Sequence, residues 1–116
     1  MLLPALVSLF VATAAAQVPH DTVTNVRELP IVELRAAHST NATVAIILSG
    51  DGGWADIDEK VGKRLQARGI DVVGLDMRDY LRGGGRSPAG IGRDVSRIAR
   101  RYMALWQKHD VALVGY

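Results

Sequence analysis

The chain has 116 residues, of which 48% are hydrophobic, 22% charged and 5% aromatic, so it has room for at most one ordinary soluble domain and is neither disordered nor collagen-like. It carries 14 Lys and Arg residues against 12 Asp and Glu, and the net charge of +2 lies wholly after Ala16 with both signs interspersed. A nucleic-acid-binding protein would show a concentrated basic excess instead. The absence of cysteine excludes a disulfide scaffold, thiolate metal sites and a cysteine nucleophile.

Residues 1–16 form an apolar run, MLLPALVSLFVATAAA, that is too short to span a bilayer. The run is typical of a secretory signal peptide, because small residues near its end give A-x-A cleavage patterns, although no Lys or Arg precedes it. A buried hydrophobic N-terminal helix is the alternative. We predict export to the periplasm or the cell exterior, a mature chain that begins at Gln17 without a membrane span, and an extended segment over residues 17–28.

The remaining sequence opens with two strand patterns. Residues 30–35 alternate apolar and polar side chains, as a half-buried edge strand does. Residues 43–48, TVAIIL, are continuously apolar, which is typical of a central parallel strand covered on both faces. The intervening Asn41-Ala42-Thr43 matches a glycosylation sequon, which we interpret as strand-entry residues.

A glycine-rich turn over residues 49–53 leads into a predicted helix. Asp56 and Glu59 resemble a capping box at its start, and Gly69 ends it. Residues 70–75 then form a second buried strand. The helix has apolar residues at four-residue spacing, namely Ile57, Val61 and Leu65.

After a loop over residues 83–87, a second helix is predicted to begin at Pro88 with Ser87 as its N-cap. Its apolar face extends to about Lys108, and residues 111–114 form a third buried strand. The order β, β, α, β, α, β predicts an α/β fold with a mostly parallel sheet, flanked by helices and joined by right-handed crossovers. The apolar face consists of Ile91, Val95, Ile98, Tyr102, Leu105 and Trp106.

Gly115 and Tyr116 follow the last predicted strand at its carboxyl end, where open α/β sheets place ligand chemistry. A strand in mid-sheet needs a neighbour on each side and cover on each face, so we expect the sequence to be the N-terminal part of a longer protein. A strand followed by glycine and any residue is also how a nucleophile elbow, G-x-S-x-G, begins. The predicted serine nucleophile is therefore the residue after Tyr116.

Three stretches resemble the VirJ/AcvB family of bacterial virulence proteins, over about residues 31–116. They are residues 45–56 (AIILSGDGGWAD), 67–76 (ARGIDVVGLD) and 111–116 (VALVGY), and the run L-S-G-D-G-G-W is the most specific. Around residues 82–92 the sequence departs from the family, because G-G-G-R-S-P-A-G replaces the usual aromatic and T-P-E character. Contacts of a substrate loop cannot be transferred there.

The resemblance implies that residues 29–116 are the N-terminal part of an α/β-hydrolase domain, located in the periplasm, with the serine nucleophile directly after Tyr116. It also implies two different roles: hydrolysis of aminoacylated (lysyl) phosphatidylglycerol, and support of type IV secretion and DNA transfer to plant cells. We expect the complete protein to be a serine ester hydrolase without a cofactor, acting on a phospholipid or small ester, and the 116-residue chain to be inactive alone. The competing hypothesis is a non-enzymatic periplasmic protein that contacts secretion components and not nucleic acid.

The glycine loop is the candidate site within the chain. In an α/β-hydrolase the corresponding loop donates a backbone N–H to the oxyanion hole, and the expected donor is Asp51 or Gly52, with Gly53 beside them. Which residue donates depends on whether residues 49–50 or 51–52 align with the His-Gly pair of related hydrolases. Trp54 would then line the mouth of the pocket. Alternatively, the loop is a tight turn that needs positive φ angles, and Trp54 packs the helix onto the sheet.

A third interpretation of the same loop is a dinucleotide site. Gly50-x-Gly52-x-x-Ala55 satisfies the fingerprint G-x-G-x-x-G/A, and Asp76 stands where a ribose-binding acid would lie. The negative charge of Asp51 beside a pyrophosphate and the exported compartment disfavour this interpretation. We predict instead that Asp76 caps the loop after its strand.

Two further patterns involve charged and histidine side chains. A basic stripe on the second predicted helix either contacts anionic phospholipid headgroups or is a solvated face. The three histidines show no metal-ligand spacing, so we predict surface histidines and no metal site. The stripe consists of Arg93, Arg97, Arg100 and Arg101, and the histidines are His20, His38 and His109.

Overall fold

The structure is a computed structural model that describes residues 25–84 and 86–116; the predicted signal peptide and His20 lie outside this part of the chain. The predicted order of strands and helices is confirmed, with one additional short helix, α2. The elements are β1 (Ile31–Leu34), β2 (Thr43–Leu48), α1 (Asp56–Ala67), β3 (Asp71–Leu75), α2 (Met77–Leu81), α3 (Pro88–Leu105) and β4 (Asp110–Val114).

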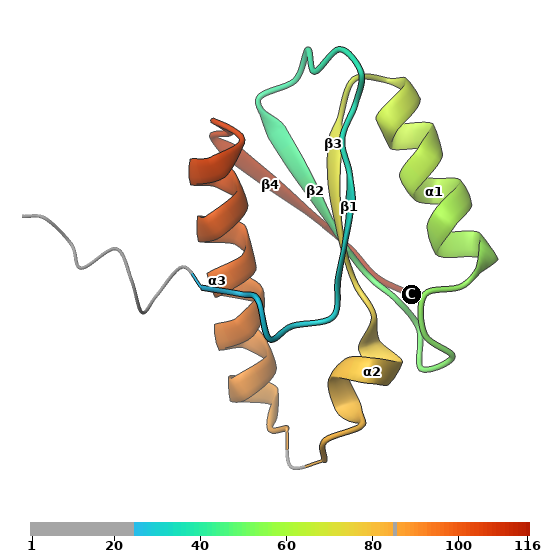
Figure 1. Cartoon of the computed structure of the whole chain (residues 1–116), viewed down its shortest axis with the longest axis vertical. Helices are drawn as coiled ribbons and strands as arrows, with labels where there is room; N and C mark the ends of the chain where they lie inside the picture. The colour runs from blue at the N-terminus through green and yellow to red at the C-terminus, as the bar shows by residue number, and fades with distance from the viewer. Residues whose placement is uncertain (1–24, 85) are drawn as a thin grey trace, which may run out of the picture.

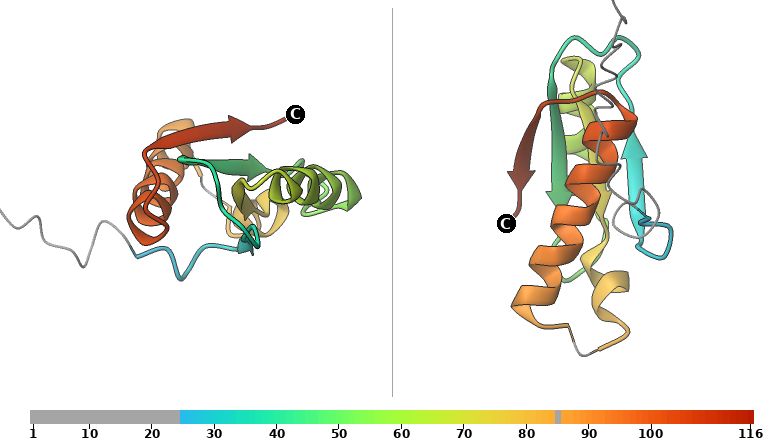
Figure 2. Two further views of the ribbon diagram at one scale, coloured as in Figure 1. Left: turned by 90° about the horizontal axis from the view of Figure 1, so that it is seen from above. Right: turned by 90° about the vertical axis from the view of Figure 1, so that its left-hand side faces the viewer.

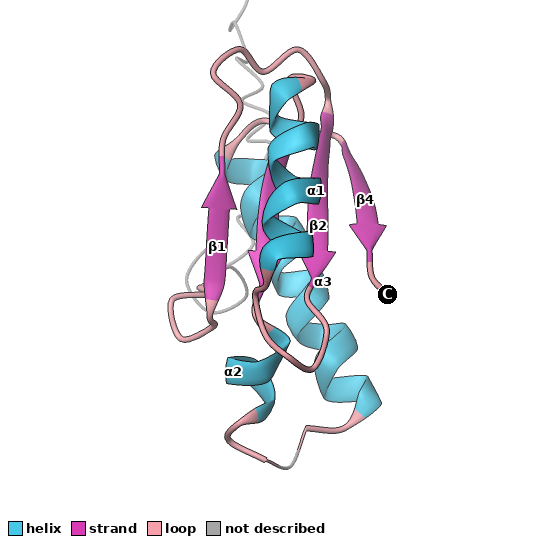
Figure 3. Ribbon diagram, turned by 90° about the vertical axis from the view of Figure 1, so that its right-hand side faces the viewer, coloured by secondary structure: helices cyan, strands magenta, loops and turns pink. Residues whose placement is uncertain are grey.

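The strands form one sheet in the order β1-β3-β2-β4. β2 pairs in parallel with both β3 and β4, whereas β1 is antiparallel to β3 at the opposite edge. The continuously apolar strand β2 is therefore central, as its sequence predicts, and β3 lies beside it. Because the three parallel strands share one direction, their carboxyl ends lie at the same edge of the sheet (Figure 3).

Helices cover both faces of the sheet, α1 on one side and α3 on the other (Figures 1 and 2). Alternate residues of β2 point to opposite faces, so this one strand contributes to two hydrophobic clusters. On the side of α3 the core contains Val44, Ile46, Val73, Leu75, Tyr80, Ile98, Tyr102 and Trp106. On the side of α1 it contains Ala45, Ile47 and Val72, packed against Leu34, Trp54, Val61 and Leu65.

The start of α1 differs from the prediction. The N-cap is Ala55, and the carboxylate that accepts its backbone N–H belongs to Asp58 at 2.9 Å, so the predicted Asp56 and Glu59 capping box is wrong by one residue. Ile57 is 53% exposed, although the prediction places it on the apolar face. The reason is that the buried face runs through Asp58 and Gly62, which turns the preceding residue toward solvent.

β4 also differs from the prediction of a buried strand, because Val111 is 39% and Leu113 is 59% exposed. In the described part of the chain, β4 pairs with β2 alone and forms an edge of the sheet. Leu105 of α3 is half exposed as well. The apolar sequence of β4 is that of a covered strand, but residues 25–84 and 86–116 leave its outer side open.

The other predicted cap residues, and the glycine that ends α1, are confirmed. Gly69 ends α1 with φ +79°, a conformation that favours glycine. Ser87 caps α3 by accepting a hydrogen bond from the Gly90 N–H at 3.0 Å, and Asp76 caps α2 through the Asp79 N–H at 3.2 Å. In the strand-entry segment, Asn41 accepts a hydrogen bond from the Thr43 N–H at 3.0 Å.

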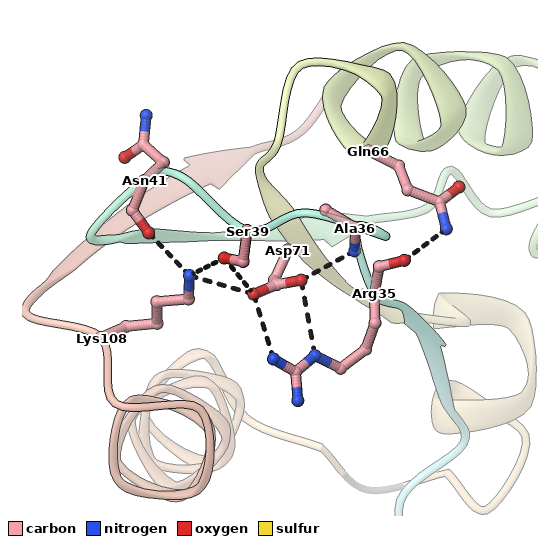
Figure 4. A network of polar contacts seen from close by, with 7 residues as sticks. All are labelled: Arg35, Ala36, Ser39, Asn41, Gln66, Asp71 and Lys108. Atoms are coloured by element: carbon pink, nitrogen blue, oxygen red, sulfur yellow. Dashed lines mark hydrogen bonds and ion pairs between the residues drawn. The ribbon is translucent and has the colours of Figure 1, made fainter.

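A buried carboxylate holds together the segments at the amino ends of the parallel strands, which we call the amino end of the sheet (Figure 4). Asp71, the first residue of β3, accepts hydrogen bonds from the Ala36 N–H and the Ser39 hydroxyl, both at 2.8 Å. The ammonium of Lys108 lies 3.0 Å from this carboxylate, and the guanidinium of Arg35 lies 3.4 Å away. Burial raises the pKa of Asp71, but these hydrogen bonds, that from Lys108 foremost, lower it to about 2.

Candidate functional site

The loop between β2 and α1, residues 49–53, is closed by its own backbone. The Gly53 N–H donates to the Gly50 carbonyl at 3.0 Å, and the two residues form an isolated antiparallel bridge. Gly53 has φ +87°, so this turn requires the left-handed conformation that glycine adopts without a steric cost. The N–H of Gly53 is therefore engaged within the loop.

Asp51 and Gly52 form the exposed tip of the loop. No carbonyl of residues 25–84 or 86–116 accepts a hydrogen bond from either backbone N–H. A Cβ placed on Gly52 would meet no atom within 4 Å. The tip thus presents two backbone donors and open space at the edge where the parallel strands end.

The first residue of the loop, Ser49, is hydrogen-bonded to the end of β3 and to the start of α2. Ser49 is buried, its N–H donates to the Leu75 carbonyl at 3.1 Å, and its Oγ accepts from the Met77 N–H at 2.8 Å. The Ser49 hydroxyl also donates to the Gly50 carbonyl at 3.1 Å. The ends of β2 and β3 are consequently held together directly beneath the exposed tip.

Trp54 packs against the sheet. A Cβ on Gly74 would fall 2.3 Å from the indole ring, so the ring fills the space that this glycine leaves on β3. The indole Nε1 donates to the Glu59 carboxylate at 2.8 Å, and this hydrogen bond is the leading cause that lowers the pKa of Glu59. These contacts place Trp54 in the α1-side core beside the glycine loop.

Tyr116, two residues beyond β4, reaches back to the first turn of α1. Its hydroxyl lies 3.1 Å from both carboxylate oxygens of Asp58. Its ring lies 3.2 Å from the position of a Cβ on Gly50. Asp58 is only 1% exposed and does not appear among the residues that the sequence predicts, although its place three residues after an N-cap is typical of a capping carboxylate.

A comparison with known protein families matches the part of the chain that contains the glycine loop. The sequence model of the family described as bacterial virulence protein (VirJ) matches residues 42–116. The chain belongs to the VirJ family. The match spans β2 to β4 and so includes the glycine loop, Asp58 and Tyr116. Comparisons with curated proteins and with solved structures give no significant match.

The VirJ-family resemblance and the α/β fold class are thereby confirmed, and the glycine loop lies inside the matched region. The acidic first turn of α1 disfavours the dinucleotide interpretation, because a pyrophosphate at this helix start would meet Asp56, Asp58 and Glu59. Asp76, the other residue of that interpretation, caps α2.

The basic stripe of this VirJ-family chain is interrupted by a buried acid, Asp94, which the sequence pattern does not predict. Asp94 accepts hydrogen bonds from the Tyr80 hydroxyl at 2.6 Å and from Arg86 and Arg97, each at 2.9 Å. Arg97 also pairs with Glu28 at 2.5 Å, and the hydrogen bond from Arg97 is the leading cause that lowers the pKa of Glu28. Arg97 therefore joins α3 to the segment before β1, while Arg93, Arg100 and Arg101 are exposed.

The part of the VirJ-family chain that the structure describes contains no cluster of side chains that could hold a metal ion. His38 and His109 are exposed, as predicted. Among residues 25–84 and 86–116, no three His, Cys, Asp or Glu side chains gather closely enough to hold a metal ion. No helix in the same ranges is both long and apolar enough to cross a membrane.

Proposed function

We propose that the complete VirJ-family protein is an exported, periplasmic serine hydrolase that cleaves esters, with aminoacyl (lysyl) phosphatidylglycerol as the leading substrate class. The observation that carries this proposal is the glycine-loop tip at the carboxyl edge of the sheet, where Asp51 and Gly52 are exposed and no carbonyl of the described residues accepts their N–H groups. Exposed backbone donors at this edge suit the oxyanion hole of acyl transfer.

The position of β4 supports the proposal. β4 is the neighbour of β2, so Gly115 and Tyr116 follow the strand next to the glycine loop. In α/β-hydrolases the second oxyanion donor is the N–H of the residue after the nucleophile, which sits on the turn that leaves such a strand. A serine directly after Tyr116 would therefore face the exposed loop tip.

In this mechanism the loop residues act on the carbonyl oxygen of the ester. The serine oxygen attacks the carbonyl carbon, and the negative charge that develops on the carbonyl oxygen is stabilised by the loop N–H and its partner donor. Gly52 lets the substrate approach because it has no Cβ. The closure of the loop by Gly53 and Gly50 holds the donors in place before the substrate binds.

The exposed edge at β4 supports a domain that continues beyond these strands. Val111 and Leu113 have an apolar pattern that further strands and helices of a hydrolase domain would cover. The triad acid and histidine would come from those elements, because in this fold they follow the serine in chain order. On this basis the described residues supply the oxyanion loop and not the triad.

The same edge favours the competing function, a non-enzymatic periplasmic component that supports type IV secretion. An exposed strand edge with apolar side chains can pair with a strand of a partner protein. This function requires no nucleophile, and it predicts that the exposed glycine-loop tip is irrelevant to the biological role.

The two functions are separated by an assay of the complete purified protein on vesicles that contain lysyl-phosphatidylglycerol. The hydrolase proposal predicts release of free lysine, detected by mass spectrometry, and labelling of one serine by a fluorophosphonate probe. Vesicles of unmodified phosphatidylglycerol are the control. A protein that supports secretion but neither releases lysine, nor cleaves simple esters, nor reacts with the probe would contradict the proposal.

A further inference from the structure

We propose that Asp58 and Tyr116 form a positioning pair that fixes the end of β4 against the glycine loop, and that this contact sets the alignment of the reacting groups. The inference rests on the proposed hydrolase function, which it deepens by assigning a task to two residues outside the oxyanion loop. Neither residue is expected to touch the substrate. Both act through the backbone segments that they hold together.

The contact joins the two segments that must be aligned. Gly50 begins the glycine turn, and the ring of Tyr116 packs where a Cβ of Gly50 would be, at 3.2 Å. The Tyr116 hydroxyl lies 3.1 Å from both oxygens of Asp58 in α1. The tyrosine therefore bridges from the end of β4, across the loop, to the helix that the loop leads into.

Asp58 is well suited to hold this tyrosine. It is nearly fully buried, and its carboxylate also accepts the Ala55 N–H at 2.9 Å, so the helix start fixes its orientation. Tyr116 itself is 71% exposed, which means that its burial contributes little to the stability of the core. The hydrogen bond of this exposed residue to a buried, oriented carboxylate indicates a role in alignment.

The alignment matters because the two proposed oxyanion donors lie on either side of this contact. One is the loop tip at Asp51 or Gly52, next to Gly50, and the other belongs to the turn that follows Tyr116. A small shift of Tyr116 would change the distance between the donors. Misplacement of reacting groups by about 1 Å can lower a rate by about 100-fold.

The first test is Tyr116→Phe in the complete protein, because this change removes the hydroxyl and keeps the ring. We expect kcat for ester hydrolysis to fall about tenfold, with KM changed less than about twofold and the melting temperature unchanged. Asp58→Asn keeps an oxygen acceptor and should retain at least half of kcat. Asp56→Asn, on the exposed side of the same helix turn, is the matched control and should behave as the wild type.

A second readout tests the contact without any substrate. Desolvation of the Tyr116 hydroxyl is the leading cause that raises its pKa, and the hydrogen bond to Asp58 and the charges of Asp58 and Asp51 raise it further, against a lowering by the Gly50 backbone. The absorbance difference between wild type and Tyr116→Phe follows this phenol during a pH titration. Asp58→Asn should lower this raised pKa, because it removes the charge of Asp58, and Asp56→Asn should leave it unchanged.

The outcomes separate the inference from the function on which it rests. Wild-type protein that hydrolyses no ester overturns the proposed function and the inference with it. An active wild type with an unchanged kcat in Tyr116→Phe overturns the inference alone. A Tyr116 phenol that titrates at its ordinary pKa in the active protein also overturns it, because the contact with Asp58 would then be absent in solution.

Discussion

The polar groups at the two ends of the central strands differ in whether they are hydrogen-bonded within the protein. At the amino end, Asp71 is fully buried and accepts hydrogen bonds from the backbone of Ala36 and from several side chains (Figure 4). At the carboxyl end, Asp51 and Gly52 are exposed, and no carbonyl in the described part of the chain accepts their N–H groups. We call the amino end, where Asp71 is fully hydrogen-bonded, the saturated end of the sheet. The carboxyl end, with the exposed loop tip, is the open end.

On the function that we propose, this difference separates the residues that stabilise the fold from those that take part in chemistry. No buried side-chain nitrogen or oxygen of the described residues lacks a hydrogen-bond partner, so the open donors belong to the exposed backbone of the loop tip. Polar groups that are satisfied internally stabilise the fold, whereas exposed donors on a fixed loop are available to a ligand. Substitutions at the two ends should consequently affect different observables.

The largest effect is expected at the saturated end. Asp71→Ala leaves the ammonium of Lys108, whose side chain is 4% exposed, without its carboxylate, and we expect a loss of about 3–5 kcal/mol in the free energy of unfolding. Urea unfolding measures this change. Asp110→Ala, at an exposed position, is the control and should change the free energy by less than about 0.5 kcal/mol. A loss below about 1 kcal/mol in Asp71→Ala would contradict a structural role for the network.

A smaller loss is expected where the indole meets the sheet. A Cβ at Gly74 would lie 2.3 Å from the ring of Trp54, so Gly74→Ala should lower the free energy of unfolding by about 1–3 kcal/mol. The same change in a Trp54→Ala background should cost much less, which a double-mutant cycle measures. Equal losses in both backgrounds would show that Trp54 does not pack on Gly74 and would favour a place at the pocket mouth.

The pH dependence of stability tests the role of Asp71 without a substitution. The pKa of Asp71 is about 2 in the folded protein and 3.8 ordinarily, so the ionised carboxylate stabilises the fold above about pH 4. This contribution, about 2–3 kcal/mol at most, should be lost as the pH falls from about 4 to about 2. Urea unfolding across this range measures it. A wild-type stability that stays constant between pH 4 and pH 2 would contradict the lowered pKa.

Most of the sheet could be predicted from the sequence because burial on two faces leaves a clear pattern. The continuous apolar run at residues 43–48 predicts a central strand, the mainly apolar residues 70–75 predict a second buried strand, and the alternation at 30–35 predicts the edge. Helix α2 could not be predicted, because its five residues are too few to show a helical period. The exposure of β4 could not be predicted either, since its apolar sequence is that of a covered strand.

The candidate site could be predicted from the sequence only in part, because some of its contacts join residues far apart in the chain. The glycine loop is local, so its turn and its exposed donors follow from consecutive residues. The contact of Tyr116 with Asp58 joins residues 58 positions apart, and that of Lys108 with Ser39 joins residues 69 apart. Such contacts depend on the three-dimensional arrangement of β4 and α1 around β2, which no local pattern encodes.

Gly52→Ala in the complete protein tests most directly whether the open end of the sheet serves chemistry and not stability. A Cβ at this position meets no atom within 4 Å, so the fold should tolerate it, but it should obstruct the approach of an ester to the loop N–H groups. Gly92→Ala on the exposed face of α3 is the matched control. We expect an unchanged melting temperature for Gly52→Ala, with ester turnover reduced about tenfold or more. Full turnover in Gly52→Ala, or a loss of turnover that only accompanies a loss of stability, would contradict this expectation.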